Sequence, residues 1–109
     1  MDSIKSITDE VVKFRNERDW EQFHNSKDLA LAISIEASEL NELFLWKDSE
    51  EANKEKLKEE LADVFTFALL LAHKQGLDVS QIILEKLKAN ALKYPVDKAK
   101  GNAKKYNEL

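Results

Sequence analysis

Apolar residues recur every three or four positions through most of the chain, which is the spacing of an amphipathic α-helix. Ser3 can cap a first helix, Asn25 or Ser26 a second, and Ser49 a third. Together these signals predict four helices, over about residues 4–18, 26–46, 51–74 and 79–93.

The ends of the last two predicted helices carry clear local signals. Gly76 follows the third helix at the position where a left-handed residue often ends a helix. Asp78, three residues before a glutamine, resembles the start of a capping box and begins the fourth helix. That helix stops at Tyr94 and Pro95, because proline disfavours helical backbone in the residue before it.

The composition supports an all-α class. Two glycines and one proline in 109 residues leave little material for tight turns, and 43% of the residues are hydrophobic. We therefore expect one all-α domain over residues 1–95 with a four-helix bundle-like core, followed by a lysine-rich arm over 96–109. Since so small a core leaves helix faces to cover, we also expect a homo-oligomer.

Charge and cysteine content exclude several functional classes. A formal net charge of -4 argues against a nucleic-acid backbone or an anionic membrane as partner. The absence of cysteine excludes disulfides, thiolate zinc sites and a thiol nucleophile. The first residues contain no apolar signal core, and no apolar run approaches the roughly 20 residues of a membrane span. We expect a cytoplasmic protein.

Two pairs of acidic residues interrupt the apolar stripes of the second and third predicted helices. Glu36 and Glu39 are three positions apart and share one helix face, as do Glu60 and Asp63. Asp63 is expected to be partly buried, because the only other polar residue of 61–72 is a threonine. Ordinary surface acids explain the first pair equally well, but the second pair weakens that alternative. Buried carboxylates are costly unless they pair or bind a cation.

A set of four carboxylates suits a hard cation. Mg²⁺, with Mn²⁺ as an alternative, is expected there together with the phosphates of a substrate. A di-iron centre would need a Glu-x-x-His motif on each of two helices, and neither His24 nor His73 is in that register. The alternative from another class is a non-catalytic helical oligomerisation or interaction module, whose acids bind a structural cation or a basic partner.

Aromatic and polar residues outside the acid pairs are further candidates. The connection after the first helix carries Trp20 and His24 and is too aromatic for a solvated linker, so it should fold back onto the helices. Composition alone does not decide whether these aromatic residues seal the end of the bundle or bind a ligand. Asn90 falls on the apolar stripe of the fourth helix, with Lys86 and Lys93 beside it, and a solvent-edge position is the alternative.

The order Glu36-x-x-Glu39 and then Glu60-x-x-Asp63 resembles the MazG-like superfamily of all-α nucleotide pyrophosphohydrolases. Five further segments are similar to its dCTP pyrophosphatase branch: RDWEQFH, ELNELFLWK, EELADV, NALKYP and KKYNEL. The similarity covers nearly all of the chain after the first helix. Ile35 stands where the wider superfamily often has an additional glutamate, which leaves the base preference open.

The resemblance implies Mg²⁺-dependent hydrolysis of a deoxynucleoside triphosphate, dCTP or a modified dCTP, to monophosphate and pyrophosphate, as house-cleaning of the nucleotide pool. It makes the two acid pairs the catalytic metal ligands: Glu36, Glu39, Glu60 and Asp63. It assigns base, sugar or phosphate contacts to Trp20, Trp46, Phe67, Lys86, Asn90, Lys93 and Tyr94. The position of Phe67 can hold a tyrosine in a relative. A dimer or a tetramer is implied as well.

Overall fold

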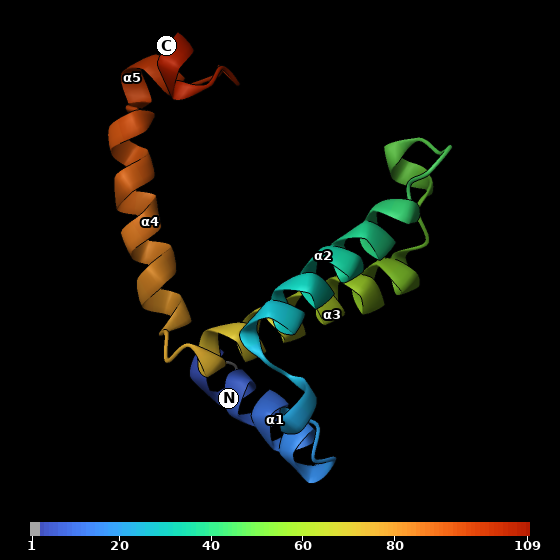
Figure 1. The fold of residues 1–109 in the computed structure, drawn as a ribbon. Helices are drawn as coiled ribbons and strands as arrows, with labels where there is room; N and C mark the ends of the chain where they lie inside the picture. Colours follow the sequence, from blue (N-terminus) through green and yellow to red (C-terminus); the bar gives the residue numbers. More distant parts are fainter. Residues whose placement is uncertain (1–2) are drawn as a thin grey trace. The chain divides into compact units, whose positions relative to one another are not determined.

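The computed structural model describes residues 3–109, and all regular elements in that range are helical (Figure 1). The long helices are α1 (Ile4–Glu17), α2 (Ser26–Glu42), α3 (Lys54–Lys74) and α4 (Val79–Lys93). The shorter elements are α5 (Val96–Ala99) and the 3₁₀ turns η1 (Glu21–Phe23), η2 (Ser49–Glu51) and η3 (Tyr106–Glu108). The expected all-α class is confirmed.

Side-chain caps fix the starts of the four long helices. Each cap accepts a hydrogen bond from the backbone N–H three residues further on, and the caps are Ser3, Asn25, Asn53 and Asp78. The predicted start of the third helix was wrong, because Ser49 begins the turn η2 and Asn53 caps α3. The predictions for Ser3, Asn25 and Asp78 are confirmed.

The predicted end of the second helix was also wrong. α2 ends at Glu42, and the backbone then turns, with the Lys47 N–H donating to the Phe44 carbonyl at 3.0 Å. Trp46 has a φ of 62°, in the left-handed region that bulky side chains rarely adopt. The apolar period thus continues past the point at which the helix stops.

The ends of α3 and α4 agree with their sequence signals. Gly76 has a φ of 67°, its N–H donates to the His73 carbonyl, and the Leu77 N–H donates to the Ala72 carbonyl at 2.9 Å. This pair of hydrogen bonds is a Schellman motif, which satisfies carbonyls at the helix end. α4 stops two residues before Pro95, as predicted.

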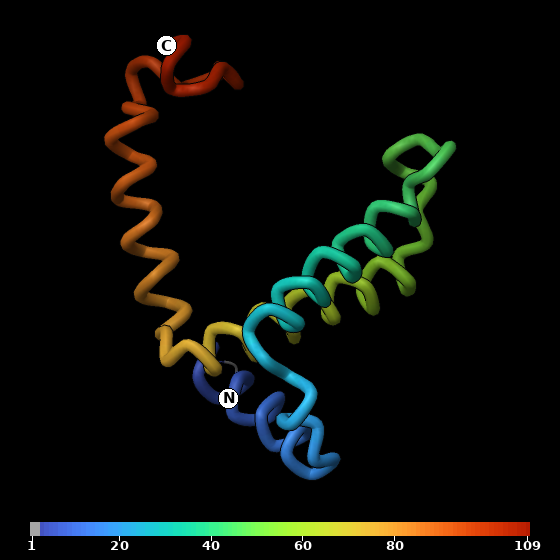
Figure 2. The backbone as a smooth tube through the Cα atoms, viewed as in Figure 1, coloured from blue at the N-terminus to red at the C-terminus, as the bar shows by residue number. Residues whose placement is uncertain are grey.

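The residues up to Leu77 form one compact unit of three helices. α2 and α3 pack side by side as an antiparallel hairpin, and α1 crosses α3 (Figures 1 and 2). Leu29 and Leu70, 1% and 3% exposed, form the centre of the apolar core with Ala72. The connection between α2 and α3 lies at the end of this hairpin that is remote from α1 (Figure 2).

Residues 78–109 form a second unit, made of α4, α5 and η3. Within it, the arm returns to the end of α4, where the Tyr106 ring lies edge-on to Tyr94 with 6.2 Å between ring centroids. The Lys93 ammonium lies 4.9 Å from the centre of the Tyr106 ring. The boundary between domain and arm after residue 95 stays a prediction. Each helix in residues 3–109 is too short or too polar to cross a bilayer.

Candidate metal centre and adjoining cleft

Three carboxylates from two helices meet where α2 packs against α3. Glu36 of α2 and the pair Glu60 and Asp63 of α3 each offer one oxygen, and these oxygens all lie within 4.8 Å of one another. The three-residue spacing of Glu60 and Asp63 places both on the face of α3 that meets α2. Small rotations of these side chains would bring the oxygens around one hard cation.

The electrostatics of the cluster show how strongly its negative charges oppose one another. Burial raises the pKa of Glu36 to about 7, and a hydrogen bond and the charge of Glu39 act in the same direction, followed by the charges of Asp63 and Glu60. Burial, and then a hydrogen bond with Glu39 that favours the protonated carboxyl, also raise the pKa of Glu60. A bound proton or a bound cation would relieve the same repulsion.

Two oxygens of the cluster lack a hydrogen-bond partner in the described part of the chain. Oε2 of Glu36 and Oε2 of Glu60 are buried and have no hydrogen bond among residues 3–109. An oxygen in that state loses its hydration without compensation, so the donor set fits a divalent cation. Glu39 is exposed and lies outside this three-oxygen group, but its hydrogen bond and its charge raise the pKa of both Glu36 and Glu60. Its place among the metal ligands stays a prediction.

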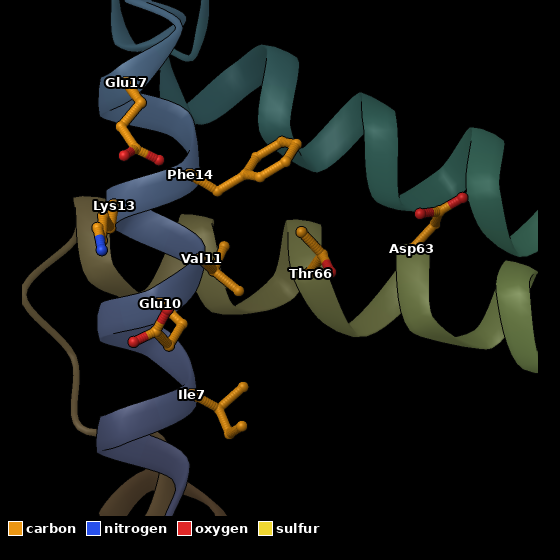
Figure 3. Close-up of a pocket in the computed structure, with 8 residues that line it drawn as sticks. All are labelled: Ile7, Glu10, Val11, Lys13, Phe14, Glu17, Asp63 and Thr66. Atoms are coloured by element: carbon orange, nitrogen blue, oxygen red, sulfur yellow. The ribbon is translucent and has the colours of Figure 1, made fainter.

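A cleft of about 510 Å³ opens beside Asp63, between α1 and α3 (Figure 3). Its lining combines apolar and charged side chains, namely Ile7, Glu10, Val11, Lys13, Phe14, Glu17, Asp63 and Thr66. Asp63 is exposed because it faces this cleft, so its expected burial was wrong. The volume falls in the roughly 300–1,000 Å³ range of small-molecule sites.

The α1 side of this cleft was missed by the sequence reasoning. Val11 and Phe14 lie on the apolar face of α1, and their spacing predicted a helix but no part in a site. Phe14 is 50% exposed, which is more than a core residue of that stripe would be. The signal available in the sequence was the aromatic residue itself, close to the aromatic connection that follows.

The connection between α1 and α2 folds back onto both α1 and α3, as predicted. The Trp20 ring lies edge-on to Phe14 with 5.9 Å between centroids, and the Arg18 guanidinium lies 3.7 Å from the centre of the Phe14 ring. The His24 ring lies edge-on to Phe67, with 6.3 Å between centroids. The predicted contact residue Trp20 therefore supports a wall of the cleft.

The other predicted substrate residues lie elsewhere. Trp46 is 93% exposed in the connection between α2 and α3, beside a hollow of about 430 Å³. Four predicted residues belong to the second unit, on α4 or directly after it: Lys86, Asn90, Lys93 and Tyr94. Asn90 is half-buried and the other three are exposed. Their role in the site stays a prediction.

The cluster predicts a titration in the neutral range. In the metal-free protein, the Glu36 carboxyl should titrate with a midpoint near 7, measured by ¹³C NMR of the side-chain carboxyl. Because the pKa of Glu36 is 4.5 when unperturbed and higher in the folded state, its contribution to stability is fully present below pH 4.5 and is lost as the pH rises to about 7. Glu39→Gln should lower the midpoint, and a wild-type midpoint near 4.5 would contradict this account.

Comparisons with known proteins identify the family of this chain. A model of the MazG-like family matches residues 31–109. The chain is 41% identical to dCTP pyrophosphatase 1 of Mus musculus and 38% identical to that of Homo sapiens, each over 105 aligned positions. These alignments cover 89% of this chain and 62% of each relative, so the chain spans about three fifths of their length.

A solved structure supports the same assignment. The crystal structure of a pyrophosphatase from Archaeoglobus fulgidus DSM 4304 is similar, with a TM-score of 0.78 and 34% sequence identity. The match covers 84% of this chain and 91% of the archaeal one. The fold, the order of the acid pairs and the family match agree, and the chain belongs to the MazG-like family.

Proposed function

We propose that this protein hydrolyses a deoxynucleoside triphosphate, dCTP or a modified dCTP, to the nucleoside monophosphate and pyrophosphate, and thereby cleans the nucleotide pool. The observation that carries the proposal is the convergence of Glu36, Glu60 and Asp63 to within 4.8 Å beside a cleft of about 510 Å³. Membership of the MazG-like family and the names of the mammalian relatives support the reaction and the base.

In the proposed reaction, the acids hold the metal ion and accept a proton, while the ion activates the water and neutralises the phosphates. A Mg²⁺ or Mn²⁺ ion held by Glu36, Glu60 and Asp63, with Glu39 beside them, would neutralise the triphosphate and lower the pKa of the attacking water. The water oxygen bonds to the α-phosphorus, the bond to the bridging oxygen breaks, and pyrophosphate leaves. A carboxylate of the cluster accepts the proton of the water.

The cleft beside Asp63 is the proposed place of the nucleoside. Val11 and Phe14 provide an apolar wall against which a base or sugar can pack, and Asp63 lies at the side of the cleft where the phosphates would meet the acids. Trp20 supports Phe14 from behind, and Phe67 lies one turn after Asp63 on α3. Neither Trp20 nor Phe67 lines the cleft itself, but each lies next to a residue that does, which supports the proposed contacts.

We propose a homo-oligomer, dimer or tetramer, in which α4 completes a four-helix core. Large apolar side chains of α2 and α3 are exposed in a single chain: Leu31, Ile35, Leu61 and Phe65 are 41% to 61% exposed. Trp46 belongs to the connection between α2 and α3, and this connection lies at the end of the hairpin remote from α1 (Figure 1). Trp20 instead packs on Phe14 of α1. Both tryptophans can line one base site only if a second copy supplies Trp46.

Replacing Asp63 tests the catalytic role of the cluster. Asp63→Asn removes one charge from the three-oxygen set, so pyrophosphate release from dCTP in Mg²⁺ should fall on the order of 100-fold or more. Helicity measured by circular dichroism should not change. Asp9→Asn is the matched control, because Asp9 is exposed and pairs only with Lys5 at 3.4 Å on α1. Substantial turnover by Asp63→Asn would refute the metal role.

A mixing experiment tests the contribution of Trp46 from a second copy. The variants Asp63→Asn and Trp46→Ala should each be weak alone, but a refolded equal mixture should regain intact sites. In a dimer with random pairing, about a quarter of the sites would then combine a native Asp63 with a native Trp46. The measurement is pyrophosphate release at low dCTP. Activity equal to the mean of the separate variants would show that Trp46 does not act across copies.

A further inference from the structure

We propose that His24 is a positioning residue of the nucleotide site, which orients the ring of Phe67 one helical turn beyond Asp63 and so sets substrate affinity and base selectivity. The inference rests on the proposed function, because it takes the nucleotide as the ligand that Phe67 meets. The imidazole and the phenyl ring meet edge-on, with 6.3 Å between centroids and 72° between planes. Both side chains are half-buried.

The segment that carries His24 is held firmly at its start. The Arg15 carbonyl accepts hydrogen bonds from the N–H groups of Arg18 and Trp20, both at 3.2 Å. The next turn follows directly, because the His24 N–H donates to the Glu21 carbonyl at 3.0 Å. Consecutive turns therefore fix the backbone that delivers the imidazole.

A buried cation lies under this segment. Arg15 is 4% exposed, and its guanidinium donates to Oδ1 of Asn16 at 2.8 and 3.0 Å and lies 3.6 Å from Oε2 of Glu21. The arginine thus joins the last turn of α1 to η1. A buried charge held in this way makes the connection costly to rearrange.

The residue after His24 is equally well anchored. Asn25 caps α2 by accepting from the Asp28 N–H at 2.9 Å, and its amide donates to the Asp28 carboxylate at 2.9 Å. His24 therefore lies between two fixed points, η1 and the start of α2. The backbone on both sides of His24 is thus held in place, and the edge-on contact brings its ring against Phe67.

The state of the imidazole fits a positioning role. Burial, and then the charge of Arg15, lower the pKa of His24 below its usual 6.5, so the ring is neutral at pH 7. Nδ1 is buried and has no hydrogen-bond partner among residues 3–109, which leaves the contact with Phe67 as a determinant of ring orientation. A neutral ring adds no charge that would compete with a cation for the nearby acids.

The test compares KM with kcat in single variants. His24→Ala frees the Phe67 ring, so KM for dCTP should rise about fivefold while kcat changes by less than about twofold. The preference for dCTP over the other deoxynucleotides should narrow, and the Kd of an α,β-imido dCTP analogue, measured by calorimetry, should rise by the same factor as KM. His24→Phe keeps a ring against Phe67 and should restore the KM for dCTP and the Kd of the analogue.

Two controls separate positioning from folding. His73→Ala removes an exposed histidine near the end of α3 and should leave all kinetic parameters unchanged. In a Phe67→Leu background, His24→Ala should no longer raise KM, because the ring that it positions is gone. An unchanged KM in His24→Ala, or a loss confined to kcat, would overturn the inference. So would failure of His24→Phe to restore KM, or a rise in KM from His24→Ala that is just as large in the Phe67→Leu background. An inactive wild-type protein would instead refute the proposed function.

Discussion

The packing of α2 against α3 is the constraint on which the rest of the structure depends, because it forces carboxylates of both helices into one small volume. Glu36, Glu60 and Asp63 approach to within 4.8 Å, and two of their buried oxygens have no partner in the described chain. Like charges at such separations oppose folding unless a proton or a cation compensates them. Burial and these neighbouring charges raise the pKa of Glu36, and the same negative charges would favour binding of a divalent cation.

The elements around the α2–α3 hairpin form a cleft beside the acids. α1 crosses α3 next to Asp63, and its apolar stripe is partly left open as the wall of a cleft. The connection that follows α1 is held by the buried Arg15, contacts Phe14 through Trp20, and brings His24 against Phe67, one turn after Asp63. One short segment therefore connects the cleft wall with the acid-bearing helix, which is why a substitution in it is expected to affect binding more than chemistry.

Local physics explains what could be predicted from the sequence. Helix periodicity depends only on near neighbours, and the four long helices that it predicted were confirmed. The three-residue spacing of Glu60 and Asp63 is equally local, and both residues contribute an oxygen to the acid cluster. The end of α2 was missed because apolar residues continue the helical period through Trp46, where the backbone already turns. The cleft was missed because it joins Val11 to Asp63, and the crossing of two helices leaves no local signal. The predicted contacts of the α4 residues stay a prediction, because α4 belongs to a separate unit of the structure.

The most direct test of the central claim is pyrophosphate release from a panel of deoxynucleotides and ribonucleotides, with 5-methyl-dCTP included, in Mg²⁺ and in EDTA. The account predicts release that requires the divalent cation and favours dCTP or its methylated form. Cation-dependent release from every deoxynucleotide alike would keep the reaction and contradict the base preference. No release from any nucleotide would contradict the account as a whole, and would favour a helical interaction module in which the acids bind a structural cation.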